Sequence, residues 1–203
     1  MMKLRLFGTD IIVSYTLLCM IAVCIILDIF SGFLMCSGAV LIHEAGHILV
    51  MRFLGYRPES IKISPFEISI NDSSRAARSI KENFFIILFG PLNNFICVIL
   101  LFLLYLCSGV NVMQFALANL SLGVFNLLPV MSLDGGQLLY LILSRRFECK
   151  SAERAVNALT FIAIFPIAVL GFLILFKSQY NFSLLFVCVY LILSLVLKNN
   201  RYF

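Results

Sequence analysis

Two histidines and a glutamate stand together in an otherwise apolar stretch of the chain. They are His43, Glu44 and His47, within FLMCSGAVLIHEAGHILVMRFLG. On a helix, side chains four positions apart share one face, so both imidazoles would point the same way. In this HExxH pattern the imidazoles bind zinc and the glutamate acts as general base on a water molecule. The pattern therefore predicts a zinc hydrolase site.

The alternative is that the three groups are satisfied in a helical core or face lipid. Ionisable groups within a membrane helix cost several kcal/mol without compensation and are usually functional. A metal-binding role for His43 and His47 is therefore favoured.

The third zinc ligand must be a carboxylate or a cysteine, because the chain contains only two histidines. The seven cysteines form no CxxC pair, which argues against a thiolate site and a disulfide framework. Asp134, in NLLPVMSLDGGQ, is the best candidate. Pro129 would break a helix before it, and Gly135 and Gly136 would allow close backbone approach. A helix N-cap is the other role open to Asp134.

The composition indicates an integral membrane protein. Of 203 residues, 62% are hydrophobic and 12% are charged, and the mean hydropathy is +1.06. Soluble domains carry about 25% charged residues. We interpret the net charge of +5 as a sign of membrane topology rather than of nucleic-acid binding.

The apolar segments predict an all-α polytopic membrane protein with about six transmembrane helices. A retained helix is favoured over a signal peptide for the first segment. The predicted spans are 11–30, 33–54, 84–106, 112–131 (interrupted by Pro129), 156–176 and 182–197.

The basic residues predict the orientation. With a cytoplasmic N-terminus, every lysine and arginine except Lys177 lies on the cytoplasmic side, as the positive-inside rule requires. Both termini would then be cytoplasmic. His43 lies nine positions from Arg52, or about 13 Å along a helix, so the site would lie within the bilayer near the cytoplasm.

A short β-hairpin is predicted between the second and third helices, in SIKISPFEISIND. It would be either a surface hairpin or an exposed edge that pairs with an extended peptide. In the second case the strand residues Ile61, Ile63, Ile68 and Ile70 would contact substrate.

Three motifs resemble signatures of the site-2 protease family of intramembrane zinc metalloproteases: HEAGH at 43–47, GPLNN at 90–94 and NLLPVMSLDGG at 126–136. The last matches the NxxPxxxLDG pattern of the family, although Met131 and Ser132 stand where many relatives carry a proline. The compact layout is most similar to the sporulation-type branch, which processes a membrane-associated pro-sigma factor.

The resemblance implies a single transmembrane metalloprotease domain over 1–203, with a catalytic core at about 33–143 and without PDZ or CBS domains. It implies one Zn²⁺ held by His43, His47 and Asp134, and Glu44 as the catalytic base. The partners would be the bilayer, a membrane-protein or membrane-associated substrate and a regulatory membrane partner. The location would be a bacterial cell membrane.

Other residues of these motifs have two roles open. Asn126 would hydrogen-bond substrate or an oxyanion, or tie the broken helix to a neighbour. Asn94 would support the site or pack between helices. Gly90, Pro91, Pro129 and Gly135 are expected to shape the backbone.

Two functions other than proteolysis are possible from the sequence: a transporter and a membrane scaffold. A transporter would show inverted repeats, which the sequence lacks, and would leave HExxH unexplained. A catalytically silent homologue acting as a membrane scaffold would not need Glu44.

Overall fold

The computed structural model describes residues 1–6, 9–65, 68–177 and 189, and it is mostly helical with one small sheet. By its internal contacts the chain divides into two units, Met1–Val124 and Phe125–Phe203.

The first unit carries the sheet and the long helices. Its elements are β1 (Met2–Leu6), β2 (Thr9–Val13), α1 (Tyr15–Ile26), α2 (Phe30–Phe53), β3 (Ser60–Ile63), β4 (Ile68–Asn71), a 3₁₀ turn η1 (Ser73–Ala77), α3 (Ile80–Ser108) and α4 (Met113–Asn126), whose last two residues belong to the second unit. Helices α2 and α3 pack against each other and run antiparallel, since His43 contacts Asn94 and His47 contacts Ile86.

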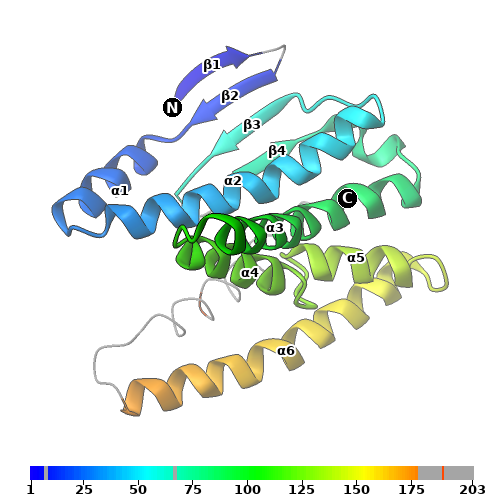
Figure 1. The fold of residues 1–203 in the computed structure, drawn as a ribbon. Helices are drawn as coiled ribbons and strands as arrows, with labels where there is room; N and C mark the ends of the chain where they lie inside the picture. The colour runs from blue at the N-terminus through cyan, green and yellow to red at the C-terminus, as the bar shows by residue number, and fades with distance from the viewer. Residues whose placement is uncertain (7–8, 66–67, 178–188, 190–203) are drawn as a thin grey trace. The chain divides into compact units, whose positions relative to one another are not determined.

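The predicted hairpin is present but belongs to a larger sheet. Strands β3 and β4 pair antiparallel, with Ile61 opposite Ile70. The sheet has four strands in the order β1-β2-β3-β4, and β2 pairs with β3 in parallel (Figure 1). The prediction of a two-stranded hairpin was therefore incomplete. Since β2 covers one side of β3, the edge strand of the hairpin is β4, with Ile68 and Ile70, and β1 is the other edge strand of the described sheet.

Two of the predicted spans differ from the helices observed, and a third is not tested. The first was placed at 11–30, but β2 runs to Val13 and α1 has only 12 residues, or about 18 Å. The fourth was placed at 112–131, but α4 ends at Asn126 after 14 residues. The last, 182–197, lies outside the described residues apart from Val189.

Two described helices, α2 with 24 residues and α3 with 29, are long and apolar enough to cross a membrane. Local signals set the ends of α3. The Ser79 Oγ accepts from the Glu82 N–H, and the Glu82 carboxylate accepts from the Ser79 N–H, which forms a capping box. Gly109, at φ 69°, ends the helix in the left-handed conformation that glycine adopts without strain.

A buried ion pair fixes the segment between the sheet and α3. The Arg78 guanidinium pairs with Asp72 and lies 5.0 Å from the centre of the Tyr56 ring. Burial lowers the pKa of Arg78, while Tyr56 and Glu82 act in the opposite direction. Tyr56 follows the end of α2, and Arg78 precedes the start of α3. Their contact therefore connects these two helix ends.

The second unit contains α5 (Asp134–Leu143) and α6 (Cys149–Lys177), preceded by an irregular segment. Pro129 lies in that segment, so the predicted interruption of the apolar run is observed. Buried Val130 and Ile164 form a small core with Phe125, Leu128 and Leu133 around them.

Candidate metal centre

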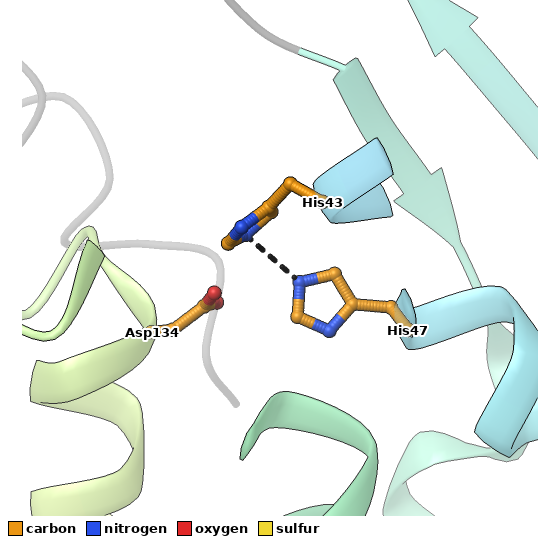
Figure 2. Close-up of side chains that lie close together, drawn as sticks. All are labelled: His43, His47 and Asp134. Atoms are coloured by element: carbon orange, nitrogen blue, oxygen red, sulfur yellow. Dashed lines mark hydrogen bonds between the residues drawn. The ribbon is translucent and has the colours of Figure 1, made fainter. Parts of the chain in front are cut away.

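The two histidines of HEAGH lie one turn apart on α2, and both are buried, with 4% and 9% of their surface exposed. Their Nε2 atoms are 3.2 Å apart, and the dashed line in Figure 2 marks this contact. The rings meet edge to face, with centroids 4.9 Å apart. The sequence spacing therefore brings the two imidazoles together as predicted from helix geometry.

Each imidazole is held by its other nitrogen from α3. The His47 Nδ1 lies 2.8 Å from the carbonyl oxygen of Ile86, which can only accept, so Nδ1 carries the hydrogen. The His43 Nδ1 lies 2.7 Å from the Asn94 Oδ1. Because the Nδ1 atom of each ring carries the hydrogen and donates it to α3, the Nε2 atom keeps its lone pair and can bind a metal.

One face of α3 provides the hydrogen-bond partners of both histidines. Ile86, Gly90 and Asn94 follow one another at intervals of four, so they lie along one helix face. Gly90 is buried between the two partners of the imidazoles. A Cβ at Gly90 would overlap Cε1 and Nε2 of His47 and would lie 2.9 Å from the His43 Nε2. Only glycine allows α3 to approach the histidine pair this closely.

Replacing Gly90 by alanine is therefore expected to displace the imidazoles and weaken zinc binding at least about tenfold, as loss of support for ligating histidines does. Affinity would be measured by competition with a chelating dye. Gly32→Ala on α2 is the matched control, because a Cβ there meets nothing within 4 Å. Equal zinc affinity in both variants would show that Gly90 does not shape the site.

Asp134 stands at the start of α5, in the second unit. Leu133 is the N-cap, and Asp134 is the first helical residue, with 9% of its surface exposed. A Cβ at Gly135 would overlap the Leu127 carbonyl, and one at Gly136 would overlap the Val130 carbonyl. The two glycines therefore let the irregular segment fold closely over the first turn of α5.

Thr160 on α6 fixes the same segment. Its Oγ1 accepts from the Met131 N–H at 3.0 Å, and it lies 3.2 Å from the Pro129 carbonyl oxygen and 2.9 Å from that of Val156. Thr160 is fully buried. Because Pro129 and Met131 flank the turn that leads to Asp134, Thr160 helps to set where α5 begins.

His43, His47 and Asp134 form a group that could hold one metal ion. All three are buried, and one ligand atom from each lies within 4.8 Å of the others (Figure 2). Two nitrogens bound to zinc at about 2.0–2.1 Å in tetrahedral geometry are about 3.3 Å apart. The 3.2 Å between the Nε2 atoms fits that value. Two nitrogens and a carboxylate are also a donor set that catalytic zinc uses.

The remaining predicted site residues lie on several elements. Glu44 is half-buried on α2, next to His43. Asn126 is the last residue of α4, and Pro91 lies within α3. Ile61 and Ile63 are in β3, and Ile68 and Ile70 are in β4. Their roles in binding substrate stay predictions.

Sequence reasoning missed three residues that support the site. Asn119 and Thr160 are fully buried polar residues within apolar helices, and Gly46 lies between the two histidines. A Cβ at Gly46 would overlap the Phe89 carbonyl and lie 2.9 Å from the Asn93 Cβ, so glycine there lets α2 and α3 touch. The only signal for Asn119 and Thr160 was a polar residue in an apolar run.

Known proteins resemble the chain in both sequence and structure. A family model described as "Peptidase family M50" matches residues 110–170. A solved structure, "Site-2 Protease from Methanocaldococcus jannaschii", matches with a TM-score of 0.64 and 25% identity, over 94% of this chain and 91% of that one. The resemblance to the site-2 proteases is confirmed.

Two curated relatives add to the resemblance to site-2 proteases. Stage IV sporulation protein FB from Bacillus subtilis (strain 168) is 34% identical over 121 residues, which are 57% of this chain and 41% of the relative. Zinc metalloprotease MJ0392 from Methanocaldococcus jannaschii is 30% identical over 133 residues, 62% of this chain and 38% of the relative. The matches thus span about two fifths of the length of each curated relative.

Proposed function

We propose that this chain is an intramembrane zinc metalloprotease that hydrolyses peptide bonds of membrane-spanning or membrane-associated proteins. The observation that carries the proposal is the buried His-His-Asp group beside Glu44. The name of one relative, a zinc metalloprotease, and the site-2 protease fold support it.

The chain's own residues have distinct tasks in this mechanism. His43, His47 and Asp134 would hold the zinc, which supplies polarisation of the scissile carbonyl and a lowered pKa for the attacking water. Glu44 accepts the proton of that water and passes it to the leaving amine. The burial of the ligands keeps other water away, which strengthens the electrostatic effect of each charged group on the reaction.

A membrane setting is supported by the outer surfaces of the two long helices. On α3, Ile99 and Leu100 are each 60% exposed and Leu106 is 62% exposed, and on α2 Leu49 is 61% exposed. Large apolar side chains exposed in such numbers are covered by lipid or by a partner. The distribution of basic residues supports a cytoplasmic position for both termini, with the site nearer that side of the bilayer.

A helical substrate must unwind before cleavage, because its peptide groups are hydrogen-bonded within the helix. Strand β4 at the edge of the sheet could hold an unwound segment by strand addition. Ile68 and Ile70 would then contact it, while Ile61 and Ile63 act from the neighbouring strand. Asn126 would donate to the substrate carbonyl. One relative is named as a sporulation protein, and the resemblance of the motifs to the sporulation-type branch leads us to propose a membrane-associated transcription-regulatory factor as the substrate class.

Removal of the metal tests the proposal. The detergent-solubilised protein would be incubated with a membrane-protein extract from cells that lack it, and new N-termini would be identified by mass spectrometry. We expect one zinc per chain by elemental analysis, cleavage of a small set of proteins, loss of that cleavage with 1,10-phenanthroline, and recovery with added Zn²⁺. Zinc binding without any cleavage would instead indicate a membrane scaffold.

A further inference from the structure

Two buried asparagines connect His43 to the backbone of α4. The His43 Nδ1 contacts the Asn94 Oδ1 at 2.7 Å, and the Asn94 Nδ2 contacts the Asn119 Oδ1 at 3.0 Å. We propose that Asn119 is a positioning residue that acts through Asn94 to hold the His43 imidazole in the metal-binding tautomer. The functional meaning of this relay, the chain of hydrogen bonds from Asn119 through Asn94 to His43, rests on the proposed zinc site.

The orientation of the Asn94 amide follows from a neighbouring carbonyl. The Asn94 Nδ2 lies 3.1 Å from the carbonyl oxygen of Ala39. A carbonyl oxygen only accepts, so the amide nitrogen must face Ala39, and the amide oxygen must face His43. The oxygen can only accept as well, so the His43 Nδ1 carries the hydrogen and Nε2 carries the lone pair.

A second carbonyl sets the Asn119 amide in the same way. The Asn119 Nδ2 donates to the Phe115 carbonyl oxygen at 2.9 Å, one turn earlier on α4. The Asn119 oxygen is therefore turned toward Asn94, where it accepts the second amide hydrogen. Both hydrogens of the Asn94 Nδ2 then have acceptors, on Ala39 and Asn119.

Burial makes the relay sensitive to each member. Asn94 and Asn119 are both 0% exposed, so water does not replace a lost partner. If Asn119 lost its oxygen, one Asn94 N–H would be buried without an acceptor, and only the Ala39 carbonyl would still hold the amide in this orientation. The rotated amide, which presents a donor to His43 and selects the opposite tautomer, would then become more populated. His47, by contrast, donates directly to the Ile86 backbone and needs no relay.

The tautomer can be read directly, because the chain has only two histidines. Protein labelled with ¹⁵N-histidine would be studied by NMR without metal, at a pH where both rings are neutral. We expect the Nδ1 atom of each ring to carry a hydrogen in the unaltered protein. In Asn119→Leu, we expect His43 to populate the Nε2–H form while His47 stays unchanged. An unchanged His43 tautomer in Asn119→Leu would overturn the proposal.

Zinc affinity provides the second measurement. We expect Asn94→Leu and Asn119→Leu each to weaken zinc binding about 10–100-fold. In the double variant, Asn119→Leu should add nothing to the effect of Asn94→Leu, since coupled residues are not additive. Additive effects would contradict action through Asn94.

Asn93→Leu is the matched control for helix packing. Asn93 neighbours Asn94 on α3, and its Nδ2 donates to the Ile42 carbonyl at 2.5 Å, so its loss removes a similar contact between α2 and α3 without touching His43. A loss of zinc affinity equal to that of Asn119→Leu would overturn the relay. If the unaltered protein bound no zinc, the proposed function would fail, but the tautomer measurement would still decide the relay.

Discussion

Replacing Glu44 by glutamine is expected to reduce peptide-bond cleavage by about 10²–10⁴-fold, the contribution typical of a general acid–base group. Glutamine has nearly the same shape but cannot accept the proton of the attacking water. Glu44 is not one of the three grouped ligands, so zinc binding and thermal stability should stay close to those of the unaltered protein. Cleavage would be measured on the proteins that the unaltered chain cuts.

The matched control is Glu82→Gln at the start of α3. Glutamine also completes a capping box, so this variant should keep both its fold and its activity. If Glu44→Gln cleaved at the rate of this control, Glu44 would not be the base. Comparing membrane proteins that accumulate uncleaved in cells carrying Glu44→Gln would also identify the substrates.

Replacing Asp134 by alanine is expected to weaken zinc binding by about 10³-fold or more, because a catalytic zinc site needs three protein ligands. Only His43 and His47 would remain from the grouped residues. Affinity would be measured by competition titration, together with the free energy of unfolding of the metal-free protein.

The two measurements separate the roles open to Asp134. An acidic residue in the first turn of a helix stabilises it by about 0.3–1 kcal/mol through the helix dipole. If Asp134 served only the start of α5, its loss would lower stability by that amount and leave zinc affinity unchanged. Asp134→Asn keeps the shape and an oxygen ligand without the charge. Its zinc affinity should therefore lie between that of the unaltered protein and that of Asp134→Ala.

The sequence was sufficient for those parts of the site that depend on short spacing. The i,i+4 pair of histidines needs only one helix, and the break at Pro129 needs only one residue. The parts that depend on pairing between distant segments were not predicted. Asn119 lies 25 residues from Asn94, and no local pattern distinguishes it from another polar residue in an apolar helix.

The N-terminal strands were missed for a related reason. Residues 9–13 contain the run Ile11, Ile12 and Val13, which continues into the apolar α1, so a membrane helix was predicted from residue 11. Their strand conformation depends on partners on both sides, Lys3 opposite Ile12 in β1 and Ile61 beside Ile11 in β3. Tertiary pairing overrides local hydropathy here.

The parallel pairing of β2 with β3 constrains the order in which the chain can assemble. Asp10 pairs with Ser60, so the whole of α1 and α2 is synthesised before β2 meets its partner. Two strands alone are marginally stable in water, so β1 and β2 gain lasting order only when β3 arrives. During synthesis, the helix that carries both histidines is therefore complete before β2 pairs with β3. That late pairing closes the backbone between the two strands, which includes α2, into a loop.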